Sequence, residues 1–465
     1  MDKINDLLRY NDIGSFDKNV DIALSNIAMY NDRFNVFCRV YYDDINVNRK
    51  RINDSILKNK HKKLAGMIIG LKDLFCYKDH PVQAASKILE GFVPSYDATV
   101  VRLISEEDGL IIGHQNCDEF GMGSSTTNSI YGESHNLLDY SRTTGGSSGG
   151  SSLAVQANMC HISLATDTGG SVRQPASYCG VIGFKPSYGV ISRFGVIEHA
   201  SSFDTVGILG RHIDDISGVF SVISRSDSSD LSMSKHSCSD VENKANYRVC
   251  VLKNTIELGC LQEEVKEGIN SFLNKLGPSI ILDEIVFDRI EYCSAVYFTL
   301  TTIEANSNLA RYTGMNYGYR SMDYKSYDEM LINTRSEGFG FEVKKRLLLA
   351  NYLFETNDVN KYIDKSISLR KYFIDRFVDI FSKYDFIVLP VTTTTAFKIG
   401  SHGSERSDWD DILTTLASIT GYPAISIPCS CDEDGMPFGV QIIGNIYGDK
   451  KLFNFVKLLY NKNII

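Results

Sequence analysis

The distribution of apolar and polar positions divides the chain into short apolar runs and amphipathic stretches. A run of about four to eight apolar residues bounded by glycine, proline or charge is typical of a buried strand, whereas apolar positions three to four residues apart predict a helix. Strands are therefore expected at residues 64–71, 110–113, 161–165, 247–252, 386–389, 424–428 and 439–443. Helices are expected at residues 98–107, 153–159, 263–276, over most of 292–384, near 410–419 and at the C-terminal end.

The order of these elements predicts the fold class. A strand, a helix and a strand follow one another at 64–71, 98–107 and 110–113, which favours an α/β fold built on an open sheet. One stretch is rich in serine and aspartate with few apolar residues, which is typical of an exposed loop. We interpret the chain as a single domain made of an N-terminal helical segment (1–60), a core (61–224), this exposed loop (225–246), a mostly helical insertion (247–385) and a C-terminal part of the core (386–465).

Composition and charge narrow the possible functions. The 465 residues are 43% hydrophobic and 23% charged, ordinary values for a soluble protein, and no run of about 18 apolar residues would span a membrane. The net charge of -9 has the wrong sign for a chain that grips nucleic acid by itself. The N-terminal sequence has neither an apolar signal core nor the character of a transit peptide, so we expect a cytoplasmic location.

Cysteine and histidine usage gives no support for a metal site. The 11 cysteines include no CxxC pair, and the nine histidines form no HxxxH or HxH pattern. We therefore expect reduced thiols, no metal ion and no cofactor in this chain.

Two stretches of small residues suggest chemistry. They read TTGGSSGGSS at residues 143–152 and TDTGGS at residues 166–171. A linker or a structural turn is the alternative, but both stretches lie between elements that look buried. The phosphate-binding patterns GxxxxGK[ST] and GxGxxG are absent after a strand, which leaves backbone N–H groups that stabilise an oxyanion. The N–H groups around Thr168, Gly169 and Gly170 would serve this role beside a nucleophilic Ser171.

A serine nucleophile needs a base, and the usual histidine is not evident near either stretch. Lys72 follows an apolar run, and a lysine that is buried enough to be neutral accepts a proton. A hydroxyl from Ser147 or Ser148 could bridge Lys72 to Ser171. Taken alone, Lys72 also fits a solvated lysine at a strand end.

These residues resemble a known motif. The amidase signature family carries GGSSGGS followed by GxDxGGSxRxP, and the chain has GGSSGGS at 145–151 and ATDTGGSVRQP at 165–175. The resemblance implies that Ser171 is the nucleophile, that Ser147, 24 residues earlier, is the bridging serine in a cis peptide after Gly146, and that Lys72 is the base. It also implies one large amidase-signature fold, with a central, mixed, mostly parallel twisted sheet covered by helices on both faces.

Two charged residues and one further serine of this motif are expected to support the site. Asp167 and Arg173 are expected to form a buried pair that orients the nucleophile turn, and Ser148 is expected to support the site from beside Ser147.

Within the family, the chain is most similar to the glutamine-hydrolysing subunits of tRNA-dependent amidotransferases. The segments that carry this similarity are 116–125, 173–186, 305–312, 342–348 and 411–423. In those ligases, ammonia released from glutamine passes to a partner subunit that activates misacylated tRNA with ATP. The resemblance therefore implies a heterotrimer with partner subunits B and C, with ATP and magnesium bound by the partner. It leaves open whether Glu-tRNA(Gln), Asp-tRNA(Asn) or both are converted.

Glutamine recognition requires further residues. The α-carboxylate of glutamine calls for an arginine and its α-ammonium for a carboxylate, roles that the similarity gives to Arg346 and Asp411. Tyr297 and Met122 are expected to line the same pocket. Two alternatives remain: a stand-alone amidase acting on another amide, and a non-catalytic scaffold, which would have no need of Lys72, Ser147 and Ser171 together.

Overall fold

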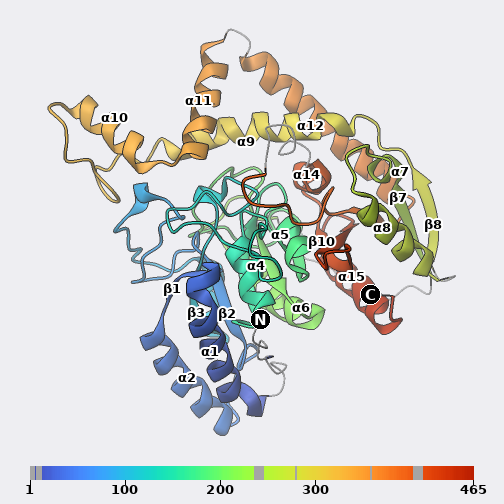
Figure 1. Ribbon diagram of the computed structural model, residues 1–465, viewed down its shortest axis with the longest axis horizontal. Helices are drawn as coiled ribbons and strands as arrows, with labels where there is room; N and C mark the ends of the chain where they lie inside the picture. Colours follow the sequence, from blue (N-terminus) through green and yellow to red (C-terminus); the bar gives the residue numbers. More distant parts are fainter. Residues whose placement is uncertain are drawn as a thin grey trace.

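The computed structural model of the chain describes residues 6, 13–234, 246–277, 280–356, 359–401 and 412–464 (Figure 1). The strands are β1 (Phe37–Val40), β2 (Ile68–Lys72), β3 (Leu110–Gln115), β4 (Ile162–Asp167), β5 (Ile182–Lys185), β6 (Thr205–Gly210), β7 (Tyr247–Leu252), β8 (Ile280–Ile285), β9 (Phe386–Pro390), β10 (Ala424–Cys431) and β11 (Pro437–Gly444). The first α-helices along the chain are α1 (Phe16–Phe34), α2 (Tyr42–Leu57), α3 (Thr99–Glu106), α4 (Gly149–Gln156), α5 (Arg173–Cys179), α6 (Ile213–Ile223) and α7 (Lys253–Ile256). The remaining helices are α8 (Glu263–Lys275), α9 (Cys293–Leu309), α10 (Tyr327–Gly338), α11 (Phe341–Glu355), α12 (Val359–Phe381), α14 (Ile412–Thr420) and α15 (Asp449–Asn461).

All described strands form one sheet in the order β1-β3-β2-β4-β6-β5-β10-β11-β9-β7-β8. Parallel pairing is confined to β3-β2-β4 and to β9-β7-β8. A mixed sheet was expected and is confirmed, but the expectation that parallel pairing would dominate is wrong. The strand β6 inserts between β4 and β5 and runs antiparallel to both, so the crossover through α5 does not join neighbouring strands.

Helices cover both faces of the sheet, as expected. Successive side chains of a strand point to opposite faces, and the apolar residues of the strands separate accordingly. In β3, Ile111 packs into the cluster formed with α3, α6 and α15, whereas Ile112 packs into the cluster formed with α1 and α4. In β9, Val388 packs into the same cluster as Ile111, whereas Ile387 points to the other face and packs against α9, α12 and α14. Strands that are apolar on both faces therefore stay buried between two helical layers.

The helices α9 to α12 form the upper part of the molecule in Figure 1, where α9 and α12 run along the top of the body and α10 and α11 project outward. Helix α9 packs against α11, α12 and α14. It therefore links α11 to the body of the fold, while α10 contacts the body through the turn at Lys87–Leu89. Among the described residues, no helix combines the length and the apolar character needed to cross a membrane.

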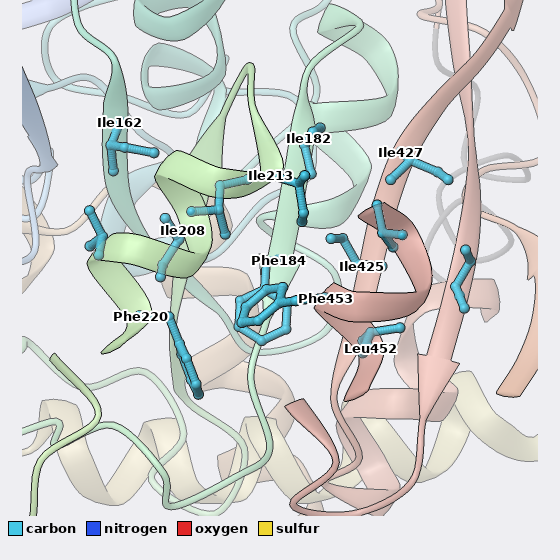
Figure 2. Packing of buried hydrophobic residues seen from close by; sticks show 14 of the residues in the cluster. Ile162, Ile182, Phe184, Ile208, Ile213, Phe220, Ile425, Ile427, Leu452 and Phe453 are labelled. Atoms are coloured by element: carbon cyan, nitrogen blue, oxygen red, sulfur yellow. The ribbon is translucent and has the colours of Figure 1, made fainter. Parts of the chain in front are cut away.

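An aromatic cluster packs the helices α6 and α15 against the sheet (Figure 2). Phe184 of β5 lies with its ring centroid 4.5 Å from that of Phe453 on α15 and 5.5 Å from that of Phe220 on α6. All three rings are buried. One strand residue thus holds two helices from different parts of the sequence.

We predict that Phe184→Ala destabilises the fold by about 3–5 kcal/mol, because it leaves a cavity between three elements. The measurement is the shift of the urea unfolding midpoint. The matched control is Phe341→Ala, since Phe341 is 80% exposed and its truncation should change stability by less than about 0.5 kcal/mol. Equal shifts for the two variants would contradict this account of the core.

Candidate active site

The centre of the candidate site is the side chain of Lys72, the last residue of β2. Strands β2 and β4 are adjacent and parallel, so their carboxyl ends lie at the same edge of the sheet. The Lys72 amine is fully buried there. Its Nζ atom lies within hydrogen-bonding distance of three hydroxyls: Ser147 Oγ at 2.7 Å, Ser148 Oγ at 2.9 Å and Thr166 Oγ1 at 3.1 Å.

The surroundings of Lys72 favour its neutral form. Burial lowers the pKa of the Lys72 ammonium, and nearby acidic groups, including Asp118, Asp167 and Asp204, only partly offset this effect. The three hydroxyls that contact Nζ carry no charge. Because Lys72 is fully buried, the alternative of a solvated lysine at a strand end is excluded.

Ser147 lies just before α4, and the peptide bond between Gly146 and Ser147 is cis. A Cβ atom on Gly146 would lie 2.2 Å from Asp118 Oδ2, so only glycine fits this position. The loop is held from both sides, because Gln174 Oε1 accepts a hydrogen bond from Gly146 N and Ser147 O accepts one from Asp118 N. These contacts fix the Ser147 hydroxyl against Lys72.

Ser171 lies in the turn between β4 and α5 and is 9% exposed. The two glycines before it are enclosed. A Cβ atom on Gly169 would lie 2.5 Å from Cζ of Tyr297, so the tyrosine ring packs directly on this residue. Gly170 has a φ angle of 145°, and a Cβ atom there would lie 2.1 Å from Oγ1 of Thr414. The side chain of Thr168 donates to Asp204 Oδ1 at 2.7 Å, which anchors the start of the turn.

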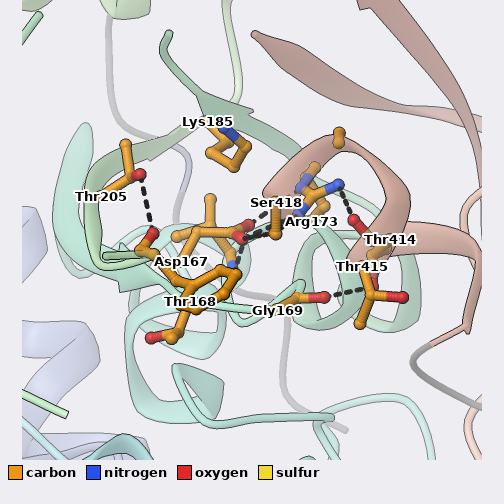
Figure 3. Close-up of polar contacts among 12 residues, drawn as sticks. Asp167, Thr168, Gly169, Arg173, Lys185, Thr205, Thr414, Thr415 and Ser418 are labelled. Atoms are coloured by element: carbon orange, nitrogen blue, oxygen red, sulfur yellow. Dashed lines mark hydrogen bonds and ion pairs between the residues drawn. The ribbon is translucent and has the colours of Figure 1, made fainter. Parts of the chain in front are cut away.

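Asp167 and Arg173 form the expected buried pair beneath this turn (Figure 3). Arg173 donates from Nε to Asp167 Oδ2 at 2.9 Å and from Nη2 to Asp167 Oδ1 at 2.8 Å. Burial raises the pKa of Asp167, but the charge and hydrogen bonds of Arg173 outweigh it, and the pKa lies below its ordinary value. Arg173 Nη1 also donates to Thr414 O at 2.7 Å and to Gln441 Oε1 at 2.5 Å. The pair therefore ties the nucleophile turn to the C-terminal part of the sheet.

Arg346 lies on α11 and is not on a solvated helix face. Its side chain is 12% exposed, whereas that of the neighbouring Lys345 is 66% exposed. The guanidinium lies over the ring of Phe298 at 5.4 Å and donates from Nε to Glu342 Oε1 at 3.3 Å. Phe298 is adjacent to Tyr297, the residue that packs on Gly169.

Met122 connects α11 to the loop that carries Ser147. It is buried in a cluster that includes Val343 and Leu347 of α11. The preceding Gly121 lies so that a Cβ atom would meet Ser147 Oγ at 3.5 Å. The structure thus gathers Met122, Tyr297 and Arg346 around α9 and α11, while Asp411 lies outside the described residues.

Sequence reasoning missed two polar residues of the site. Thr166 contacts Lys72, and its place within the TDTGGS stretch could have indicated this. Thr414 donates from Oγ1 to Gly169 O at 2.7 Å across a separation of 245 residues, and no local pattern marks it. Among the described residues, no group of three or more histidine, cysteine, aspartate or glutamate side chains is arranged to hold a metal ion.

Comparisons with known proteins agree with these motifs. The chain is 38% identical over 451 residues to the second glutamyl-tRNA(Gln) amidotransferase A subunit of Clostridium acetobutylicum, covering 90% of this chain and 94% of that protein. It is 37% identical over 456 residues to the glutamyl-tRNA(Gln) amidotransferase A subunit of Prosthecochloris aestuarii, covering 95% and 94%. The crystal structure of the glutamyl-tRNA(Gln) amidotransferase A subunit from Thermotoga maritima matches with a TM-score of 0.79 at 30% identity, covering 96% of this chain and 92% of that chain.

The family profile for amidases matches residues 18–453. This range contains both signature stretches, the strand that ends at Lys72 and the helices that carry Tyr297 and Arg346. The resemblance first seen in the motifs is therefore confirmed over nearly the whole chain, and the protein belongs to the amidase family.

Proposed function

We propose that this chain is the glutaminase subunit, known as the A subunit, of a tRNA-dependent amidotransferase and that it hydrolyses glutamine to supply ammonia. The observation that carries the proposal is the contact of 2.7 Å between the buried Lys72 amine and Ser147 Oγ, in a chain that matches the A subunits of glutamyl-tRNA(Gln) amidotransferases over at least 90% of its length.

The reaction follows from the proposed Ser171-Ser147-Lys72 triad. Ser171 Oγ attacks the side-chain amide carbon of glutamine while its proton passes to Ser147, whose own proton passes to the neutral amine of Lys72. The carbonyl oxygen becomes an anion and is stabilised by backbone N–H groups around Thr168, Gly169 and Gly170.

The tetrahedral intermediate then collapses. The C–N bond breaks, and the proton held by Lys72 returns through Ser147 to the leaving ammonia. Water then attacks the carbonyl carbon of the glutamyl ester while its proton passes through Ser147 to the amine of Lys72. The ester C–O bond breaks as this proton returns to Ser171 Oγ, which releases glutamate and restores the serine.

Recognition of glutamine is assigned to Arg346, Tyr297 and Met122, which lie around α9 and α11, and to Asp411, which is outside the described residues. Arg346 would pair with the α-carboxylate, and Asp411 would accept from the α-ammonium. Tyr297, held against Gly169, and Met122, held beside the Ser147 loop, would line the side-chain path.

The relatives' names, which call them A subunits of an amidotransferase, support a complex with other subunits. We propose a cytoplasmic heterotrimer in which subunits B and C accompany this chain, and in which ATP and magnesium bind to the partner that receives the ammonia. The partner would also hold the misacylated tRNA, in keeping with the net charge of -9 on this chain. Glu-tRNA(Gln) would be converted to Gln-tRNA(Gln).

The first prediction concerns the nucleophile. In the complex, Ser171→Ala should lower glutamine hydrolysis and glutamine-dependent conversion of Glu-tRNA(Gln) by about 10⁴-fold or more, because no acyl-enzyme forms. Conversion with added ammonium chloride should be unchanged, since the partner's chemistry is intact. Glutamine-dependent conversion that survives the substitution would refute the assignment of Ser171.

The second prediction concerns the base. Lys72→Met keeps the shape of the side chain and should abolish glutamine hydrolysis while leaving the fold intact. In the wild type, kcat/KM should rise with pH through the lowered pKa of Lys72, at a pH below the ordinary value of 10.5, because only the neutral amine accepts a proton.

Stability should change in the same direction. Below the folded-state pKa, the wild type carries the full cost of a buried ammonium. Between that pKa and 10.5, the unfolded chain binds a proton that the folded chain has lost, so wild-type stability rises with pH. Lys72→Met avoids the cost of the buried ammonium, so at low pH it should melt at a higher temperature than the wild type. Thermal melts should show this difference in melting temperature shrinking as the pH rises, and a difference independent of pH would contradict a buried, titrating amine.

The third prediction concerns recognition. Arg346→Ala should raise the KM for glutamine by about 10- to 100-fold, the loss of a charge-assisted hydrogen bond, with a small effect on kcat. The control is Lys345→Ala on the adjacent, exposed residue, which should behave as the wild type. Steady-state kinetics with a simple aliphatic amide complete the test, because a stand-alone amidase would hydrolyse that amide well and would be indifferent to Arg346.

A further inference from the structure

Thr414 contacts the turn that carries Ser171 through a hydroxyl that takes no part in the proposed proton relay. Lys72 precedes this turn in the sequence, whereas Thr414 follows it. It lies in the first turn of α14 and is fully buried. Its hydroxyl donates to the carbonyl oxygen of Gly169 at 2.7 Å (Figure 3). The same hydroxyl occupies the space where Gly170 would carry a side chain, because a Cβ atom there would lie 2.1 Å from Thr414 Oγ1.

This hydrogen bond determines the direction of one N–H group. The Gly169 carbonyl and the Gly170 N–H belong to the same planar, trans peptide and therefore point in opposite directions. When the carbonyl is held toward Thr414, the N–H is aimed away from α14. The N–H groups of Gly169 and Gly170 themselves have no acceptor among the hydrogen bonds of the described residues.

The backbone around Thr414 is itself held by hydrogen bonds from buried side chains. Its carbonyl oxygen accepts from Arg173 Nη1 at 2.7 Å, and the preceding carbonyl of Leu413 accepts from Gln441 Nε2 at 3.1 Å. Arg173 is in turn paired with Asp167 at the other end of the turn. The hydroxyl that holds Gly169 is therefore mounted on a buried, hydrogen-bonded support.

We propose that Thr414 is a positioning residue for the oxyanion hole, whose hydroxyl orients the Gly169–Gly170 peptide so that the Gly170 N–H meets the developing anion. This inference rests on the proposed amide hydrolysis at Ser171. It differs from a packing role, because only the hydroxyl, and not the rest of the side chain, sets the peptide orientation.

The test is kinetic and uses the whole complex. Thr414→Val has nearly the same shape but no hydroxyl, and it should lower kcat for glutamine by about 10- to 100-fold, somewhat less than the loss of an oxyanion donor itself. The KM for glutamine should stay within about twofold of the wild type, since the amide of the bound substrate carries no oxyanion. Thr414→Ser keeps the hydroxyl and should restore most of kcat.

The matched control is Thr415→Val. Thr415 is equally buried on the same helix, but its hydroxyl donates to the local carbonyl of Ile412 at 3.0 Å. The variant should turn over glutamine as the wild type does. Thermal melts of all variants establish that each is folded at the assay temperature.

Three outcomes would overturn the inference: equal kcat for Thr414→Val and Thr415→Val, a rise in KM that accounts for the loss in kcat/KM, or a Thr414→Ser variant as impaired as the valine. Failure of the proposed function is distinguishable from these, because the wild-type complex itself would then not hydrolyse glutamine.

Discussion

The burial of the Lys72 amine is the constraint on which the rest of the site depends. A lysine side chain with no access to water is tolerated only when it is neutral or when its hydrogens meet acceptors. Here three hydroxyls from two chain segments surround Nζ within 3.1 Å. The loop before α4 and the end of β4 must therefore converge on the end of β2, and this convergence also determines where Ser147 can act as a relay.

The large sheet provides that convergence. Because β2 and β4 are parallel neighbours, Lys72 and the turn that carries Ser171, the proposed base and nucleophile, leave the sheet at the same edge. The antiparallel strands β10 and β11 bring Gln441 and α14 to the other side of the turn that carries Ser171. The nucleophile is thus enclosed by segments from the first and last thirds of the chain, with Tyr297 of α9 packed on Gly169.

Part of this arrangement could be predicted from the sequence, for physical reasons that can be named. The strands β2, β3, β4, β7, β9, β10 and β11 were expected because their apolar runs are buried on both faces, and the base was expected because Lys72 ends such a run. The strands β1, β5, β6 and β8 were not expected. They are short or interrupted by glycine and polar residues, and β6 changes the sheet from mostly parallel to mixed by a long-range pairing that no local pattern reveals. The same limit explains Thr414, whose contact with Gly169 spans 245 residues.

The central claim is that a glutamyl ester forms on Ser171, and it can be tested by rapid acid quenching of the complex during turnover of isotopically labelled glutamine. Peptide mass spectrometry of the quenched chain would then locate the label. The proposed mechanism predicts a γ-glutamyl group on the peptide that contains Ser171, which disappears on a timescale that matches glutamate release. A label on a different residue, or turnover at full rate with no acylated peptide, would contradict it.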